Sequence, residues 1–264
     1  MKKLLSVLLI ALMAITLVAC SSSKTEETAE ETTTEEPSVT ITVGISPDYP
    51  PYESLDTDGS IIGFDAEMVK LFEQYMTEET GVSYTFEFKQ MDFDNIITQI
   101  QGGQVEVGIS GFTYSEDRTS AVDFSDPYCL SKQVAVVLAG SEFTSVEQLK
   151  GKHLVAQSGS TGEYAAQDLS DDTTGLKNAQ DMMTALDAGQ YDAAVLDSGV
   201  ANAYASSGKY TILPETLVDE ANYIVVQKGD AQMLAGINTC IAKFVASDEY
   251  KTLCEEYQLS PIEQ

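Results

Sequence analysis

The chain has 14 lysines and arginines, and Arg118 is its only arginine. A planar guanidinium donates two parallel hydrogen bonds to a carboxylate, and the ammonium of a lysine cannot reproduce that geometry. The lone arginine therefore favours a site that binds a carboxylate. The alternative is an arginine held by Glu116, Asp117 or Asp123 on a solvated loop.

Small polar residues add further candidate groups. Ser160 and Thr161 lie in a glycine-flanked turn before a predicted helix, where N–H groups and the helix N-terminus can bind an anion. Asp197 follows a predicted strand and offers an acceptor for an ammonium group. Helix capping explains both patterns as well, so these residues support a binding site only in combination with Arg118.

Three aromatic side chains lie in predicted loops, namely Tyr49, Tyr52 and Phe93. Two aromatic faces can enclose an aliphatic, amide or cationic group. Tyr49 and Phe93 are therefore candidate walls of a ligand site, whereas ordinary core packing explains Tyr52.

No catalytic set accompanies these groups. The sole histidine, His153, begins a predicted strand, and no nucleophile and base form a recognisable pair. The sequence has no Cys-x-x-Cys motif and no histidine cluster. We therefore expect no catalytic residue, no metal site and no cofactor.

Strand-like runs alternate with helical patterns along the chain. The predicted strands are residues 40–45, 84–88, 105–110, 134–138, 153–156, 193–196 and 223–226. The predicted helices are residues 64–76, 95–101, 164–169, 181–188, 200–206, 231–245 and 249–257. This alternation indicates parallel sheets covered by helices, and ligands of such sheets bind beyond the carboxyl ends of the strands. The polar residues that follow strands are therefore the site candidates.

The beginning of the chain has the composition of an export signal, which we place at residues 1–19. A basic dipeptide precedes an apolar run over residues 4–18, and this run is short for a membrane-spanning helix. Residues 17–20 (LVAC) resemble the bacterial lipobox, which implies a lipid on Cys20. Residues 21–38 are mostly Ser, Thr and Glu, so we expect a disordered acidic spacer between lipid and domain.

The remaining residues, 39–264, are strongly acidic. Six of the 42 acidic and three of the 14 basic residues precede residue 39, which leaves 36 against 11 and a formal charge of −25. Such a field repels nucleic acid and disfavours acidic ligands. We therefore expect no nucleic-acid partner.

Three cysteines remain once Cys20 is assigned to the lipid, an odd number for an exported protein. Cys240 and Cys254 lie on successive predicted helices, and we predict a disulfide between them. The alternative is that Cys240 and Cys254 are single buried thiols.

The candidate loops belong to a longer series of motifs. In chain order they are VGISPDYPPYE at 43–53, GFD at 63–65, SGFTYSEDR at 110–118, VDFSDPY at 122–128, LKGK at 149–152, QSGSTGE at 157–163 and GQYDA at 189–193. Together they resemble the polar-amino-acid family of ABC-transporter solute-binding proteins, and the resemblance covers all of residues 39–264.

The resemblance implies a role for each candidate group. Arg118 would bind the ligand α-carboxylate, helped by Thr113 and by the N–H groups around Ser160 and Thr161. Asp197 would accept the α-ammonium together with the edge formed by residues 110–111. The complete set of implied ligand-binding residues is Ser46, Tyr49, Phe93, Ser110, Gly111, Phe112, Thr113, Arg118, Ser160, Thr161 and Asp197.

The ligand class follows from the same comparison. Tyr49 and Phe93 fall where the family stacks aromatic rings on the ligand side chain. Ser46 stands where several relatives that bind cationic or amide ligands have an aspartate. Together with the negative field, this implies a polar L-amino acid, neutral or cationic, in preference to an acidic one.

The implied fold is an α/β fold of the two-lobed periplasmic-binding-protein type (type II). Each lobe would be a mostly parallel sheet flanked by helices, and two hinge strands would cross between the lobes. We expect lobe 1 at residues 39–130 plus 226–264, and lobe 2 at residues 131–225.

The implied function is that of a monomeric extracellular receptor, lipid-anchored at the cell membrane, which delivers an L-amino acid to the transmembrane subunits of an ABC permease. One alternative is a dehydratase-like enzyme on the same fold, for which no catalytic pair is evident. Another is the ligand-sensing module of a signalling receptor. We expect no such module, because no membrane span follows before residue 264.

Overall fold

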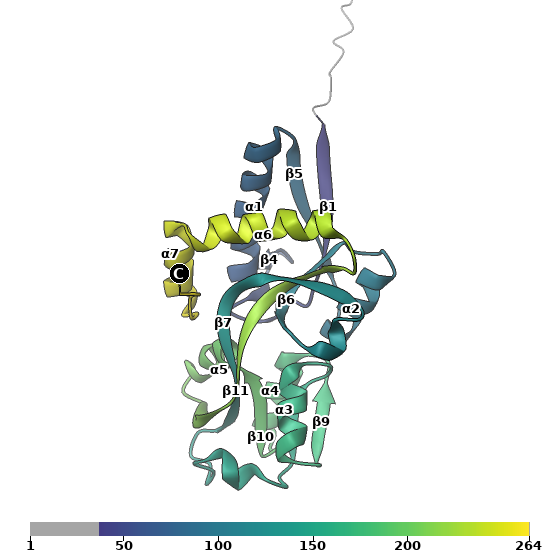
Figure 1. Ribbon diagram of the computed structural model, residues 1–264. Helices are drawn as coiled ribbons and strands as arrows, with labels where there is room; N and C mark the ends of the chain where they lie inside the picture. Colours follow the sequence, from purple (N-terminus) through teal and green to yellow (C-terminus); the bar gives the residue numbers. More distant parts are fainter. Residues whose placement is uncertain (1–36, 264) are drawn as a thin grey trace, which may run out of the picture. The chain divides into compact units, whose positions relative to one another are not determined.

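The computed structural model describes residues 37–263 (Figure 1). The predicted signal peptide, the predicted lipid site at Cys20 and the predicted spacer up to residue 36 lie outside the described residues. No helix of the described part combines the length and the apolar character that a membrane crossing needs.

One eight-stranded sheet organises the described residues, in the strand order β5-β1-β6-β11-β7-β10-β8-β9. At one end, β5 (Ser83–Gln90), β1 (Ser38–Ile45) and β6 (Val107–Thr113) are parallel. Two helices of this end are α1 (Phe64–Thr80) and α2 (Phe93–Gln101), and α2 buries Phe93, Ile96 and Ile100 at helical spacing. We call these elements, together with the strands β2–β4 and the helices α6 and α7, lobe 1.

The other end of the sheet repeats the same design. Its strands β10 (Ala193–Asp197), β8 (Leu154–Gln157) and β9 (Thr173–Leu176) are parallel. Three helices accompany them, namely α3 (Thr161–Leu169), α4 (Ala179–Asp187) and α5 (Ser198–Ala205). We call these six elements lobe 2.

Two long antiparallel strands join the lobes. β7 (Val122–Leu138) and β11 (Tyr210–Gln227) pair with each other from Val122 opposite Gln227 to Leu138 opposite Tyr210, and they run side by side in Figure 1. Each also pairs with one lobe, because β11 lies beside β6 and β7 lies beside β10. Both chain crossings between the lobes are therefore strands of the same sheet.

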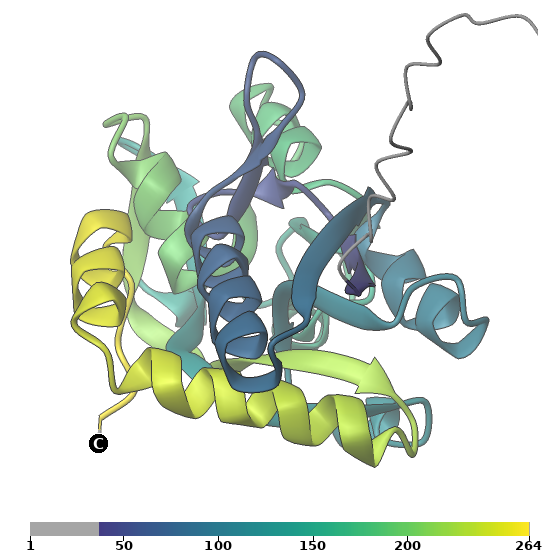
Figure 2. The same cartoon turned by 90° about the horizontal axis from the view of Figure 1, so that it is seen from above.

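Smaller elements complete lobe 1. The strands β2 (Asp48–Tyr49), β3 (Glu53–Leu55) and β4 (Ile61–Ile62) form a separate three-stranded sheet. The helices α6 (Ala231–Val245) and α7 (Asp248–Tyr257) end the chain, and α6 packs beside α1, as Figure 2 shows. Two short 3₁₀ helices, Glu116–Arg118 and Val146–Leu149, follow β6 and β7.

Gly63 shows why the GFD motif needs its glycine. Its φ of 124° lies in a region that favours glycine, and a Cβ added there would lie 2.3 Å from the carbonyl oxygen of Tyr52. The residues after it donate backbone hydrogen bonds to that segment, from Phe64 to Pro51 and from Asp65 to Tyr52. The motif therefore fixes the start of α1 against the loop that carries Tyr49 and Tyr52.

Every strand and helix that the sequence predicts is confirmed, with shifts of a few residues at the ends. The sequence did not predict β9 or the small sheet of β2, β3 and β4. It also predicted only short pieces of β7 and β11. Parts of both strands, such as residues 129–133 and 214–222, have polar sequences that resemble loops. Backbone pairing between the two strands holds them in the sheet there, without the buried apolar pattern by which strands are predicted.

The predicted disulfide between Cys240 and Cys254 is wrong. In the described residues Cys129, Cys240 and Cys254 are all buried free thiols. Cys240 faces a hollow beside α1 and β1, whereas Cys254 lies near Tyr250 and Cys129. The two thiols have different neighbours although their helices are adjacent in the chain.

Candidate ligand-binding site

A small, narrow cavity lies between the lobes. Its lining residues are Tyr49, Phe93, Ser110, Gly111, Thr113, Arg118, Gln133, Gln157, Ser160 and Thr161. Eight of these belong to the eleven residues that the sequence analysis implied, and they come from both lobes. The other three implied residues, Ser46, Phe112 and Asp197, are buried but do not line the cavity.

Arg118 lies at the cavity on the 3₁₀ helix after β6 and is only 8% exposed. Its Nη1 donates to the carbonyl of Thr113 at 2.8 Å, and its Nη2 donates across the lobes to the carbonyl of Gly159 at 2.7 Å. The guanidinium carbon lies 5.6 Å from the ring centre of Phe93 and 5.5 Å from that of Phe112. Burial lowers the pKa of Arg118.

Arg118 therefore has no carboxylate in contact among the described residues. The loop alternative, a pair with Glu116, Asp117 or Asp123, is not what holds it, since both of its hydrogen bonds go to backbone carbonyls. Asp123 instead pairs with Lys228 at 2.6 Å. A desolvated cation without a carboxylate is a strong binding group for an anion.

The turn before α3 forms the lobe 2 side of the cavity. Ser160 is the N-cap of α3, accepting a hydrogen bond from the N–H of Glu163 at 3.1 Å and donating to the carbonyl of Gln157 at 2.7 Å. The N–H of Gly159 donates to the side chain of Glu163 at 2.7 Å. Ser160 therefore both caps α3 and lines the cavity. The N–H of Thr161, in the first turn of α3, has no acceptor within its helix.

A carboxylate that the sequence analysis missed contacts both walls. Glu220 Oε2, on β11, accepts hydrogen bonds from the hydroxyls of Thr113 and Thr161, each at 3.1 Å, and from Gln133 Nε2 at 3.0 Å. All three donors line the cavity. Gln133 and Gln157 were missed as well. The sequence does mark these two positions, because each is a polar residue directly beside an apolar strand run, Gln133 before it and Gln157 after it.

The aromatic residues surround this polar set. The ring of Phe93 stacks on Phe112 with centres 4.7 Å apart, and Tyr49 stacks on Tyr52 at 6.2 Å. Phe93 and Tyr49 line the cavity, while Phe112 lies behind Phe93. Each predicted aromatic wall is therefore held in place by a second ring.

Behind Ser110, two carboxyl groups are fully buried. Ser110 Oγ donates to Glu53 Oε1 at 2.6 Å, and the hydroxyl of Tyr128 donates to Asp65 Oδ2 at 3.2 Å. Burial raises the pKa of Asp65 to about 7 and raises that of Glu53 well above its usual range. The remaining oxygen of each carboxyl group, Glu53 Oε2 and Asp65 Oδ1, is buried and has no hydrogen-bond donor among the described residues.

Ser46 is part of the same region but does not line the cavity. Its N–H donates to Ser110 Oγ at 3.1 Å, and its hydroxyl donates to Asp48 Oδ1 at 2.7 Å. Asp48 also accepts from the N–H of Ala179 in lobe 2 at 2.6 Å. Ser46 therefore orients a carboxylate that contacts both lobes.

Asp197 is 1% exposed at the end of β10. Its Oδ1 accepts from the hydroxyl of Tyr52 and from the N–H of Gly199, each at 3.0 Å, and its Oδ2 accepts from the hydroxyl of Ser131. Burial raises its pKa, and the hydrogen bond from Ser131 is the largest effect that lowers it. The carboxylate thus caps α5 and joins that helix to lobe 1 and to β7.

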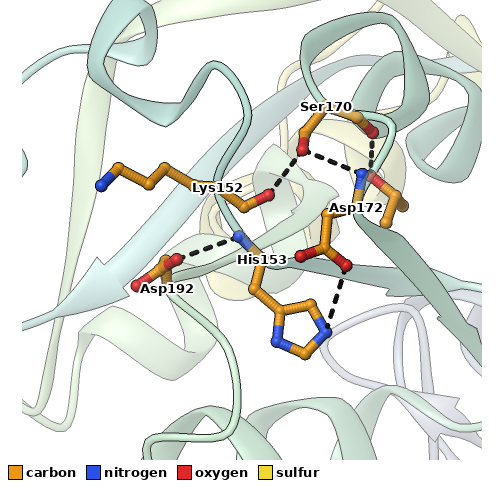
Figure 3. Close-up of polar contacts among 6 residues, drawn as sticks. Lys152, His153, Ser170, Asp172 and Asp192 are labelled. Atoms are coloured by element: carbon orange, nitrogen blue, oxygen red, sulfur yellow. Dashed lines mark hydrogen bonds and ion pairs between the residues drawn. The ribbon is translucent and has the colours of Figure 1, made fainter.

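Two other features of the described residues differ from this site. A larger hollow beside α1 and α6 is lined by Glu79, Glu106 and Asp230 but by no positive side chain, so it does not match a zwitterion. His153 lies outside the cavity, and its Nε2 is 3.7 Å from Asp172 Oδ1 (Figure 3). Its ring packs against that of Tyr191. Within residues 37–263, no group of histidine, cysteine or acidic residues is arranged to hold a metal ion.

Comparison with known proteins places this geometry in a family. A family model for bacterial extracellular solute-binding proteins, family 3, matches residues 41–260. The arginine-binding extracellular protein ArtP of Bacillus subtilis is 28% identical, covering 97% of this chain and 98% of ArtP. The ABC transporter glutamine-binding protein GlnH of the same organism is also 28% identical, covering 97% of each. The solved structure of an ancestral arginine-binding protein bound to arginine is 34% identical, with a TM-score of 0.75 over 83% of this chain and 97% of that chain.

The structural neighbours have the two-lobed type II periplasmic-binding-protein fold, which confirms the fold that the motifs implied. The family and the relatives are solute-binding proteins of transporters and not enzymes, so the dehydratase-like alternative is set aside. With the family model matched from residue 41 to residue 260, the chain belongs to the bacterial extracellular solute-binding proteins of family 3.

Proposed function

We propose that the protein binds one free polar L-amino acid, neutral or cationic, between its lobes and delivers it to the permease of an ABC importer. The observation that carries the proposal is Arg118, a buried guanidinium at the cavity with no carboxylate in contact among the described residues. A ligand α-carboxylate supplies the missing partner, and the first turn of α3 lies opposite to assist it.

The ligand class rests on charge and on the relatives. Glu220 and the acidic composition of residues 39–264 disfavour a second ligand carboxylate. Tyr49 and Phe93 are the aromatic walls for the ligand side chain. Relatives named for arginine and for glutamine match the chain almost end to end, which agrees with a cationic or an amide side chain.

The mechanism would be closure of the two lobes over the ligand, with bending at β7 and β11. We place lobe 1 at residues 39–130 plus 226–264 and lobe 2 at residues 131–225, with one refinement. Leu130 pairs with Ala221, so the return crossing lies near Ala221 and residues 222–225 go with lobe 1. The permease would recognise the closed form.

We also propose that the protein acts as a monomer at the extracellular face of the cell membrane. The chain would be exported by residues 1–19 and held by a lipid on Cys20, with the acidic stretch that follows as a spacer. Mass spectrometry of the mature N-terminus tests this. A chain that begins at a residue other than Cys20, or a Cys20 without lipid, contradicts it.

A thermal-shift screen across the proteinogenic amino acids and cystine tests the ligand proposal. A ligand at 100 times its Kd stabilises the folded state by about 2.7 kcal/mol, so binding raises the melting temperature. We expect shifts with neutral or basic polar amino acids and none with glutamate or aspartate. The Arg118→Ala variant is the matched control, and it should show no shift with any of them. If no amino acid stabilises the parent protein, the proposal is wrong.

A further inference from the structure

Asp48 connects the two lobes by polar contacts. It lies on β2 of lobe 1, directly before the cavity residue Tyr49, but does not line the cavity itself. Its Oδ2 accepts a hydrogen bond of 2.6 Å from the N–H of Ala179, the first residue of α4 in lobe 2. Gln157 Nε2, also of lobe 2, lies 3.5 Å from the same oxygen. One carboxylate of lobe 1 therefore contacts lobe 2 at two points.

Lobe 1 holds this carboxylate in position. The hydroxyl of Ser46 donates to Asp48 Oδ1 at 2.7 Å, and the N–H of Asp48 donates to the carbonyl of Ser46 at 2.8 Å. Asp48 also pairs with Ser54 of β3. Because these contacts lie within lobe 1, the side chain is already ordered and loses little conformational entropy when it meets α4.

The first turn of α4 supplies the positive end of the contact. The first N–H groups of a helix have no acceptor within the helix, and the helix dipole attracts a negative charge to them. Asn178, the N-cap of α4, accepts from the N–H of Asp181 at 3.0 Å and leaves the N–H of Ala179 to Asp48. Within residues 37–263, no positive side chain forms an ion pair with Asp48. The start of α4 is therefore its electrostatic partner.

The hydrogen bond between Asp48 and Ala179 depends on the arrangement of the lobes. Asp48 moves with lobe 1 and Ala179 moves with lobe 2, so separation of the lobes breaks the bond. The contact therefore stabilises the closed arrangement and contributes nothing to an open one. Because Asp48 does not line the cavity, this contribution does not depend on which ligand is bound.

We propose that Asp48 is an interlobe latch, whose carboxylate at the start of α4 stabilises the closed arrangement of the lobes with or without a ligand. A ligand that binds between closed lobes has an apparent affinity scaled by the fraction of the protein in that arrangement. The latch therefore changes the affinity for every ligand by one common factor. This effect on affinity rests on the proposed function, whereas the effect on the lobes without ligand does not.

Calorimetric titration with L-arginine and with L-glutamine tests the common factor. Asp48→Ala removes a hydrogen bond to a charged group and should weaken the binding of both amino acids about 10- to 100-fold. The two factors should agree within about twofold, as they do for independent sites. Asp48→Asn keeps an acceptor but loses the charge at the helix N-terminus, so it should weaken both only about two- to fivefold.

Asp92→Asn is the matched control. Asp92 also contacts lobe 2, through Lys177 at 2.8 Å, but both side chains are largely exposed. The loss of this charge should change both affinities less than about threefold. The control separates the latch from the loss of any negative charge between the lobes.

Small-angle X-ray scattering measures the arrangement of the lobes directly. Without ligand, the radius of gyration of Asp48→Ala should exceed that of the parent and of Asp92→Asn, because the closed arrangement is less favoured. Saturating L-arginine or L-glutamine should bring all three proteins to the same smaller radius.

Several outcomes overturn the inference. A loss of affinity for only one of the two amino acids would show that Asp48 recognises the ligand side chain. An equal loss in Asp92→Asn would assign the effect to the overall charge between the lobes. Equal radii of the parent and Asp48→Ala without ligand would show that the contact does not stabilise the closed arrangement. If no amino acid binds the parent, the proposed function falls, and the radii without ligand still decide the inference.

Discussion

The carboxyl ends of β6 and β10 each carry one buried charge, and the two charges have different roles. Arg118 lies in the 3₁₀ helix after β6, and Asp197 is the last residue of β10. Arg118 lines the cavity, donates hydrogen bonds to two backbone carbonyls and lies over the ring of Phe93. Asp197 lies behind the cavity wall and is hydrogen bonded to Tyr52, Ser131 and Gly199.

The difference shows that burial and position after a strand do not distinguish a ligand contact from a structural group. What distinguishes them is whether the protein itself satisfies the charge. A charge whose hydrogen bonds come from three parts of the chain stabilises the fold. A charge without an opposite charge is free to bind a ligand.

The largest effect is expected at Arg118. Arg118→Ala leaves a ligand carboxylate desolvated and unpaired, which costs about 3 to 5 kcal/mol, or about two to three and a half decades in affinity. The free energy of unfolding without ligand should change far less. Arg118→Lys should recover only part of the affinity. Calorimetric titration and urea unfolding measure the two quantities, and binding within threefold of the parent would contradict the assignment.

The reverse pattern is expected at Asp197. Asp197→Ala removes the cap of α5 and leaves Tyr52 and Ser131 without their acceptor, so the free energy of unfolding measured in urea should fall by about 2 to 4 kcal/mol. Asp230→Ala is a matched control, because Asp230 caps α6 through Met233 at an exposed position. Its loss should cost only about 1 kcal/mol. Equal losses in the two variants would show that the buried network contributes nothing beyond capping.

Asp65 is a third buried ionisable group, a carboxyl that lies behind Ser110 of β6. Its pKa is raised to about 7, so between pH 4 and pH 7 the folded state keeps a proton that the unfolded state has lost. Its contribution to stability is therefore fully present below pH 4 and is lost as the pH rises through 7. The neighbouring groups are Glu53, Tyr128 and Asp197, and the pKa of Glu53 is raised in the same direction.

The measurement is the free energy of unfolding as a function of pH. In Asp65→Asn the fall between pH 4 and pH 7 should be shallower than in the parent, by close to 1 kcal/mol per pH unit. Asp126→Asn, an exposed residue of β7, is the control and should keep the parent slope. Identical slopes in the parent and in Asp65→Asn would mean that Asp65 is ionised throughout.

The smallest effect is expected at Lys177, outside the cavity. Its Nζ lies 2.8 Å from Asp92 Oδ2 across the lobes, and both side chains are largely exposed. Exposed ion pairs contribute little, so Lys177→Ala should change ligand affinity less than about threefold at moderate salt. A larger loss in titration would show that contacts at the rim, and not only those of Arg118, determine the affinity.

The sequence predicted the fold well because apolar periodicity and turn residues are local signals. It predicted the first wall of the site because Arg118 is unique and the segment 110–118 is continuous. It missed Glu220, which reaches the site only through the pairing of β11 with β7, where Glu220 lies opposite Ser131. No local pattern reports on such a pairing.

The role of Asp197 shows the other limit. A residue type and a position after a strand describe its backbone, but its partners Tyr52 and Ser131 are 145 and 66 residues away. Only the three-dimensional arrangement shows that its oxygens already have donors. Tertiary hydrogen bonding therefore decides between two roles that local sequence leaves equal.

The position of β11 in the sheet also sets the order of folding during synthesis. β11 lies between β6 and β7, and its residues 222–227 complete lobe 1 although all other strands of that lobe precede residue 139. A nascent chain that ends before residue 222 therefore lacks a central strand of lobe 1, whereas lobe 2 is almost complete at that point. Lobe 2 can fold first, and lobe 1 closes only when the last 40 or so residues have emerged.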